Sequence, residues 1–326
     1  MGRRALITGV GGQDGSYLAE HLISLDYEVH GIIRRASVAE NQDSRVRHLE
    51  GKAVFHYGDM LDVFSLERVL REVRPDEVYN LASQSHVRIS FDVPSYTIQT
   101  NALGVLNVLE VLRHECPEAR FYQASSSEMF GGSVDADGYQ RETTPMHPVS
   151  PYGCAKVLAF NLVRHYRAAY GAFCANGILF NHESPRRGSN FVTRKVVKGA
   201  VEIKFGRRDK LSLGNIDSYR DWGHSKDYVR AMRLILAHGE PDDFVVATGE
   251  THSVREMAEY VFRTLGLDYH DHVVQDQRLV RPEELRYLRG DPMKVCSALG
   301  WRPEYTFHSM LDEMIEAELQ QARNGE

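Results

Sequence analysis

The segment SPYGCAK holds residues whose types and spacing could perform acid–base chemistry. Its surrounding apolar pattern predicts a helix, which would place Tyr152 and Lys156 one turn apart on the same face. A free phenol has a pKa of about 10, too high for a base near neutral pH, and a neighbouring ammonium lowers that pKa by favouring the phenolate. Ser126, at the end of a buried run, could bind the substrate oxygen that Tyr152 deprotonates. We predict that a carbinol is prepared here for loss of a hydride, with a chance YxxxK in an amphipathic helix as the alternative.

Glu128 follows Ser126 by two residues and is harder to explain. A hydroxyl beside a tyrosine fits a dehydrogenase, but the simple oxidation of an alcohol needs no carboxylate. One explanation is structural, since this side chain could cap the turn after the strand.

Three glycines lie between an apolar run and an amphipathic segment at the start of the chain, at Gly9, Gly12 and Gly15. Glycines at a strand-to-helix turn let backbone N–H groups approach a pyrophosphate at the helix N-terminus. The spacing is GxxGxxG rather than GxGxxG, and any such turn favours glycine, so the spacing alone is a weak signal. Its position between the first strand and the first helix predicts a dinucleotide site.

The end of the second predicted strand indicates which dinucleotide is bound. An NAD enzyme usually places an acid there to hold the ribose 2′-hydroxyl. This chain has Arg34 and Arg35 instead, with no acid beside them. Two guanidinium groups suit a 2′-phosphate, so we predict NADP as the cofactor, with an exposed basic corner as the alternative.

Two further segments end strands near this site. Asp59 could hydrogen-bond an adenine amino group, or equally cap a turn. The small residues of NLASQS, 80–85, could lie under a flat ligand or simply pack well.

The elements that must position these residues follow an alternating pattern. Strands are predicted at 3–9, 27–34, 53–59, 76–83 and 119–125, and helices at 14–26, 65–73 and 95–114. This alternation, with apolar strands, predicts an α/β fold: a doubly wound parallel sheet of the Rossmann type, covered on both faces. We predict an NADP-binding domain at 1–180 and a smaller, interleaved substrate-binding domain at 181–326, some of whose segments return to the sheet.

Composition excludes several classes of protein. The 326 residues are 42% hydrophobic and carry a net charge of −6, which disfavours a general nucleic-acid binder. The four cysteines are scattered, and neither they nor His182 and His224 show the spacing of a metal site. We find no signal peptide and no apolar run long enough to span a bilayer, so we expect a cytoplasmic protein that binds no membrane.

Several longer motifs carry a resemblance to a known family. They are TGVGGQDGSYLAEHL, YNLASQSHVRISF, SSSEMFG, HPVSPYGCAK, GILFNHESPRRG, FVTRK and RDWGHSKDYV. Together they resemble extended short-chain dehydrogenase/reductases and, more narrowly, the GDP-mannose 4,6-dehydratase family, from residue 3 to about residue 301. NHESPRRG and RDWG are far more specific than the glycine turn.

The resemblance implies roles for individual residues. The implied catalytic set is Ser126, Glu128, Tyr152 and Lys156. The cofactor contacts are Gly9, Gly12, Gln13, Asp14, Gly15, Arg34, Arg35, Asp59, Met60, Leu81, Ala82, Ser83, Gln84, Ser85, Tyr96, Lys156, His182 and Arg187. The sugar-nucleotide contacts are Ser85, Ser126, Glu128, Tyr152, Asn181, Arg186, Val192, Arg194, Lys195, Arg220, Arg281 and Glu284, with no metal ligand.

The resemblance also implies a reaction, in which a lyase of deoxysugar biosynthesis converts GDP-mannose to GDP-4-keto-6-deoxymannose. C4 is oxidised, water is lost across C5–C6 with Glu128 as base and then acid, and the hydride returns to C6. A homodimer or homotetramer is expected. Departures from the family pattern, such as Val149 and Arg286, leave open another GDP-hexose or GDP-heptose. The fold would also suit a nucleotide-sugar epimerase or reductase, or a non-catalytic NADP sensor.

Overall fold

A computed structural model describes residues 2–34, 45–280 and 283–324. Its centre is a seven-stranded sheet in the order β11-β6-β5-β4-β1-β2-β3, in which each neighbouring pair is parallel. The strands are β1 (Arg4–Thr8), β2 (Glu28–Ile33), β3 (Ala53–Tyr57), β4 (Glu77–Asn80), β5 (Arg120–Ser126), β6 (Cys174–Leu179) and β11 (Asp243–Val246). The Rossmann-type sheet is confirmed, with strands at all five predicted positions.

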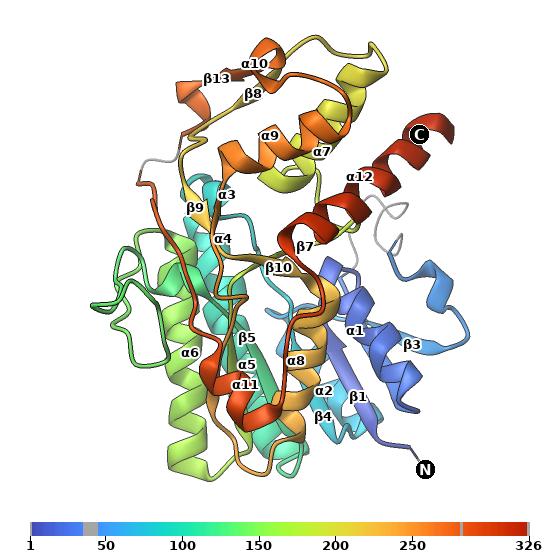
Figure 1. Cartoon of the computed structure of the whole chain (residues 1–326). Helices are drawn as coiled ribbons and strands as arrows, with labels where there is room; N and C mark the ends of the chain where they lie inside the picture. Colours follow the sequence, from blue (N-terminus) through green and yellow to red (C-terminus); the bar gives the residue numbers. More distant parts are fainter. Residues whose placement is uncertain (1, 35–44, 281–282, 325–326) are drawn as a thin grey trace.

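Helices cover both faces of the sheet (Figure 1). One face packs on α1 (Gln13–Ser24) and α8 (Ser225–Ala237), and the other on α2 (Val63–Val73), α5 (Gly104–Glu115) and α6 (Pro151–Tyr170). Along β1, Ala5 and Ile7 belong to the first core, whereas Leu6 between them belongs to the second. Because alternate residues of a strand point to opposite faces, a strand buried on both sides must be apolar throughout.

A second body of structure lies beyond the carboxyl ends of the strands (Figure 1). Its core is formed mainly by α7 (Val192–Lys204), α9 (Val254–Thr264) and α12 (Phe307–Asn324), with β8 (Leu211–Leu213) paired to β13 (Val273–Gln275). Between β8 and β13 in the sequence, α8 and β11 return to the central sheet. The division of the chain at residue 180 stays a prediction.

Shorter elements complete the described chain. The strand pairs are β7 (Asn181–Glu183) with β10 (Trp222–His224), and β9 (Tyr219–Arg220) with β12 (His252–Ser253). The short helices are η1 (Arg47–Leu49), α3 (Val87–Asp92), α4 (Pro94–Ile98), η2 (Gln99–Leu103), η3 (Ser127–Met129), α10 (Tyr269–His272), η4 (Gln277–Leu279) and α11 (Met293–Leu299).

The helix predicted at 95–114 is not regular. It comprises α4, a π-helical segment η2 and then α5. A π turn contains one residue more than an α-helical turn. The side chains that follow it therefore face directions that an α-helical pattern would not predict. The long helix is confirmed as one uninterrupted helical stretch from Pro94 to Glu115, although the apolar spacing of the sequence does not reveal its π turn.

Gly177 on β6 provides a test of the packing beneath the site. A Cβ built on Gly177 would lie 2.2 Å from the hydroxyl oxygen of Tyr122, a fully buried side chain on β5. We expect Gly177→Ala to lower the free energy of unfolding by about 1–3 kcal/mol, because the tyrosine must shift within a packed core. Gly132→Ala is the matched control, since its Cβ would meet nothing within 4 Å. Equal stability of the two variants in denaturant titrations would contradict this packing.

Candidate active site

The predicted residues meet at one edge of the sheet because its strands are parallel and their carboxyl ends point the same way. The glycine turn follows β1, Arg34 follows β2, Asp59 follows β3, and Ser126 ends β5. This edge faces the second body of structure (Figure 1).

The first turn of α6 is fixed tightly against the end of β5. Ser150 caps the helix by accepting the N–H of Gly153 at 3.0 Å, and Pro151 begins it. A Cβ on Gly153 would lie 2.8 Å from the carbonyl oxygen of Glu128, so only glycine allows this approach. The contact brings Tyr152 beside the residues that follow β5.

Ser126 ends β5, and Glu128 lies in the short helix η3 that follows it. The Ser126 hydroxyl accepts the backbone N–H of Glu128 at 3.3 Å and thereby caps η3. Both side chains are buried, with 9% and 8% of their surface exposed. The Ser126 hydroxyl therefore caps this turn.

Tyr152 interacts electrostatically with this group. Burial raises its pKa to about 12. A hydrogen bond with the Ser126 hydroxyl lowers the pKa, the Glu128 charge raises it, and Arg187 lowers it. These four predicted residues therefore lie together.

Lys156 lies one turn along α6, with its Nζ 5.7 Å from the centre of the Tyr152 ring. The ammonium donates to the carbonyl oxygen of Ala124 at 2.8 Å. Burial lowers the pKa of Lys156 to about 8, so below that pH the group is mainly charged. Burial of the phenol outweighs the charges that favour phenolate, so the pKa of Tyr152 lies above that of a free phenol. That the Lys156 ammonium lowers this pKa stays a prediction.

The glycine turn can accept an anion. Gly9 has φ of 69°, which favours glycine, and a Cβ there would lie 2.8 Å from the backbone nitrogen of Ala82. Gly12 is the N-cap of α1 and has no side chain to bond the N–H groups of the first turn. Those donors and the helix dipole fit a phosphate group. A Cβ on Gly15 would meet the Gly9 carbonyl oxygen at 2.4 Å, so this glycine brings helix and turn together.

Arg34 and Tyr96, two predicted cofactor residues, lie together. The Arg34 guanidinium donates to the Tyr96 hydroxyl and lies 6.0 Å from the ring centre. Arg35 lies outside the described residues. The cation at the end of β2, with no acid at that position, fits a 2′-phosphate.

Asp59 and Met60 follow β3. One carboxylate oxygen of Asp59 accepts the N–H of Leu61 at 2.9 Å, as the turn-capping alternative predicted. Met60 is buried, and its carbonyl oxygen accepts from Asn107 at 2.9 Å. The adenine contact of Asp59 stays a prediction.

Residues 81–85 are held by Asn101, which the sequence reasoning missed. Its Oδ1 accepts the Ser83 hydroxyl at 3.1 Å and the Gln84 N–H at 2.8 Å, and its Nδ2 donates to the Gln84 carbonyl at 2.9 Å. Asn101 belongs to the π-helical segment. Asn101 is 1% exposed. The sequence signal that could have found it is a polar residue within an apolar helical run, because a buried polar side chain needs hydrogen-bond partners.

A buried polar cluster joins α1 to the segment after β6. His182 Nδ1 donates to the Phe180 carbonyl at 2.7 Å, and its Nε2 contacts Asp14 Oδ2 at 2.8 Å. Although burial opposes both charges, the ion pair lowers the pKa of Asp14 and raises that of His182. Gln13 donates to the His182 carbonyl at 3.2 Å, so three predicted cofactor residues form one unit.

The arginines of SPRRG point in different directions. Arg187 pairs with Glu183 at 2.9 Å and lies 3.6 Å from the centre of the Phe191 ring. Arg186, predicted to contact the sugar nucleotide, pairs with Glu20 of α1 at 2.6 Å and lies over Tyr17. Its contact with the sugar nucleotide stays a prediction, whereas the charge of Arg187 lowers the pKa of Tyr152.

The remaining predicted substrate contacts lie around the second body of structure. Asn181 begins β7, while Val192 begins α7, which also carries Lys195 and Arg194. Arg194 donates to the Arg187 carbonyl at 2.9 Å.

Arg220 and Glu284, both predicted substrate contacts, lie 3.4 Å apart. Arg281 lies outside the described residues. The sugar-nucleotide roles of this whole set stay predictions.

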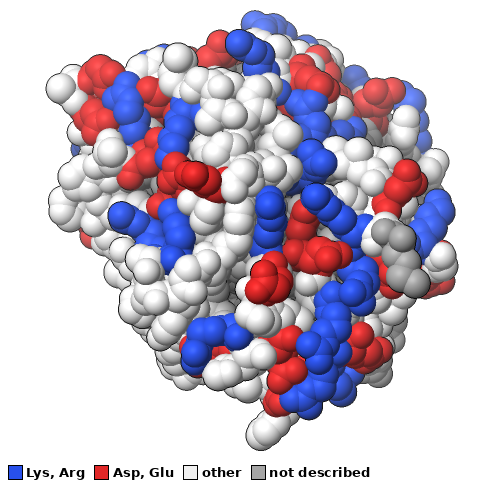
Figure 2. Space-filling model, turned by 90° about the horizontal axis from the view of Figure 1, so that it is seen from below, with Lys and Arg blue, Asp and Glu red and all other residues white. Residues whose placement is uncertain are grey.

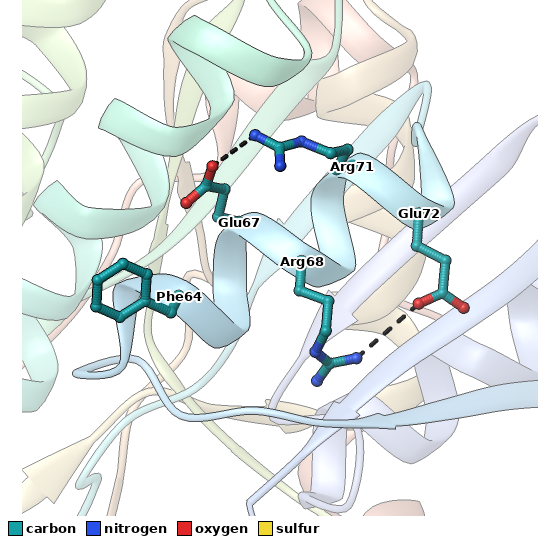
Figure 3. Close-up of a pocket in the computed structure, with 5 residues that line it drawn as sticks. All are labelled: Phe64, Glu67, Arg68, Arg71 and Glu72. Carbon is teal, nitrogen blue, oxygen red and sulfur yellow. Dashed lines mark hydrogen bonds and ion pairs between the residues drawn. The ribbon is translucent and has the colours of Figure 1, made fainter.

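Other features of the described surface add no second site. A depression of about 350 Å³ on the outer side of α2 is lined by Phe64, Glu67, Arg68, Arg71 and Glu72 (Figure 3). Its arginines pair with its own glutamates, and it contains none of the predicted site residues. On the face seen in Figure 2, basic and acidic side chains are intermixed.

Within the described residues, no group of three or more His, Cys, Asp or Glu side chains could hold a metal ion. No described helix is both long enough and apolar enough to cross a membrane.

Known proteins resemble this chain over nearly its whole length. A family model described as GDP-mannose 4,6 dehydratase matches residues 6–314. GDP-mannose 4,6 dehydratase 1 of Arabidopsis thaliana is 48% identical over 331 residues, which cover 98% of this chain and 90% of the plant protein. GDP-mannose 4,6-dehydratase of Vibrio cholerae is 46% identical, covering 99% and 95%.

One solved structure has a similar fold over nearly the whole chain. RMD from Pseudomonas aeruginosa, complexed with NADPH, is 26% identical, with a TM-score of 0.82 over 98% of this chain and 99% of that one. On the family match and the two relatives, the chain belongs to the GDP-mannose 4,6-dehydratase family.

Proposed function

We propose that this protein is an NADP-dependent GDP-mannose 4,6-dehydratase, which converts GDP-mannose to GDP-4-keto-6-deoxymannose and water. Its relatives at 48% and 46% identity carry that name. The observation that carries the proposal is the buried Glu128 beside Ser126 and Tyr152, because a dehydratase needs a further acid–base group and a simple dehydrogenase does not.

The glycine turn, Arg34 and Lys156 would hold the cofactor. The pyrophosphate would meet the N–H groups at the start of α1, and Arg34 the 2′-phosphate, while Lys156 would reach the nicotinamide ribose. Bound NADP supplies an acceptor for the hydride of C4 and later returns that hydride to C6. The NADPH complex of RMD, a neighbour in fold, supports this choice.

Ser126 and Tyr152 carry the first proton transfer. The serine hydroxyl orients the C4 oxygen, and the phenolate form of Tyr152 takes its proton as the alcohol becomes a ketone. A phenol with a pKa of about 12 needs nearby positive charge for this task, and Lys156 and Arg187 provide it.

Glu128 carries the second transfer. Once C4 is a ketone, the proton on C5 is acidic, and the carboxylate can remove it. The same group, now protonated, can deliver the proton to the departing C6 hydroxyl, which leaves as water. Because one carboxylate performs both steps in turn, its charge is restored. Once the hydride has added to C6, C5 regains a proton from solvent, and Tyr152 releases to solvent the proton that it took from the C4 hydroxyl.

We propose a homodimer or homotetramer that works in the cytoplasm and binds neither nucleic acid nor membrane. Ile98, Leu103 and Leu158 support self-association, because each is about two-fifths exposed or more on the adjoining helical segments α4, η2 and α6.

The pair Tyr152 and Lys156 gives the next prediction. Tyr152→Phe should abolish turnover and leave NADPH affinity nearly unchanged, whereas Lys156→Ala should reduce both. In the unmodified protein, kcat/KM should fall as pH rises through about 8, because Lys156 loses its proton there and no longer favours the phenolate. A pH–rate profile and fluorescence titration with NADPH measure these effects. Equal loss of cofactor affinity in the two variants would contradict the division of roles.

Glu128→Gln tests the dehydration itself, because glutamine keeps the size and most hydrogen bonds but cannot take a proton. Product formation should slow by roughly 10²–10⁴-fold, the usual contribution of a general acid–base group. The same variant should also lose the exchange of the C5 hydrogen with solvent deuterium.

An isotope experiment distinguishes a dehydratase from an epimerase. GDP-mannose with deuterium at C4 should give a product with deuterium at C6, read by mass spectrometry and NMR. Deuterium retained at C4 with an intact C6 hydroxyl would indicate an epimerase. If the protein removes water only from a different GDP-sugar, that sugar replaces GDP-mannose as the proposed substrate.

A further inference from the structure

Arg45 lies between two segments of the cofactor site, and no role has been assigned to it so far. Its Nε donates to the carbonyl oxygen of Arg186 at 2.9 Å, and its Nη1 donates to that of Gly11 at 3.4 Å. Gly11 belongs to the glycine turn, and Arg186 to the segment that carries Arg187. The guanidinium therefore lies at the turn where the pyrophosphate is expected.

Three other arginines surround this group. Burial, followed by the charges of Arg194, Arg186 and Arg187, lowers the pKa of Arg45. Each neighbour has a carboxylate: Glu318 lies 3.4 Å from Arg194, Glu20 lies 2.6 Å from Arg186, and Glu183 lies 2.9 Å from Arg187. Within the described ranges, no carboxylate pairs with Arg45 itself, so the cluster carries one positive charge that the described protein does not balance.

The donors of Arg45 are also incompletely used. A guanidinium has five N–H groups in a planar fork that matches phosphate oxygens. Residues 2–34, 45–280 and 283–324 supply acceptors for two of them, one at a long distance. A partly buried cation with spare donors is stabilised by an anion that it can bond directly.

We propose that Arg45 binds the diphosphate of the dinucleotide cofactor and links the glycine turn to the Arg186–Arg187 segment over it. This inference rests on the proposed function, since it assumes that the glycine turn holds a dinucleotide. The diphosphate of the sugar nucleotide has the same chemistry, but the bond to Gly11 favours the cofactor. Arg34 and Arg45 then divide the recognition, with Arg34 on the 2′-phosphate and Arg45 on the part that NADP shares with NAD.

The test compares Arg45→Gln with Arg45→Lys. Glutamine keeps an N–H donor near the position of Nε but has no charge, and lysine keeps the charge without the fork. Fluorescence titrations give Kd for NADPH and NADH, calorimetry gives Kd for GDP, and thermal unfolding checks the fold. Arg68→Gln, a change of an exposed arginine on α2, is the matched control and should alter none of these values.

We expect Arg45→Gln to weaken NADPH and NADH binding by the same factor, roughly tenfold to a hundredfold, the range of one charge-assisted hydrogen bond. Arg45→Lys should lose less, and GDP affinity should stay unchanged. The difference from the unmodified protein should shrink at high salt, because salt screens the lost charge.

Four results would overturn the proposal. Loss for NADPH alone would assign Arg45 to the 2′-phosphate, and loss for GDP alone would assign it to the sugar nucleotide. Equal losses in both variants, together with a lower unfolding temperature, would leave Arg45 as a structural link only. If the unmodified protein binds neither NADPH nor NADH, the proposed function fails, whereas normal binding by Arg45→Gln refutes only the role of Arg45.

Discussion

The close contact between the first turn of α6 and the end of β5 sets the geometry of the site. Gly153 lies against the Glu128 carbonyl with no room for a Cβ, and Ser150 holds the start of the helix. Because α6 and β5 are both anchored in the core, this contact fixes the phenol, the serine hydroxyl and the carboxylate relative to one another. A site on rigid elements holds reacting groups more accurately than one on loops.

Burial has opposite effects on the two partners of the YxxxK pair. It raises the pKa of Tyr152 to about 12 and lowers that of Lys156 to about 8, because it disfavours each charged form. The phenol therefore keeps its proton in a dry site until positive charge and a bound hydroxyl favour its release. The same desolvation strengthens every electrostatic interaction around the reacting sugar.

Much of the fold could be predicted because it depends on local pattern. Apolar runs and glycine turns identified five strands, and the order of segments along the chain placed their ends at one edge. The π turn at Gln99–Leu103 could not be predicted, because one extra residue per turn leaves the apolar pattern nearly unchanged. Neither could the direction of Arg186 toward Glu20, since two adjacent arginines look alike until tertiary contacts separate them.

The interleaving of the two bodies of structure has a consequence for how the protein is made. β11 forms the sheet edge beside β6, yet it follows α7 and β8 of the second core in the sequence. A nascent chain that has emerged only as far as β6 therefore presents an unpaired parallel edge, and an unpaired edge invites aggregation. That edge is covered only after the long stretch from Phe180 to Asp242 has been synthesised. The parallel pairing also closes a long loop, which slows folding.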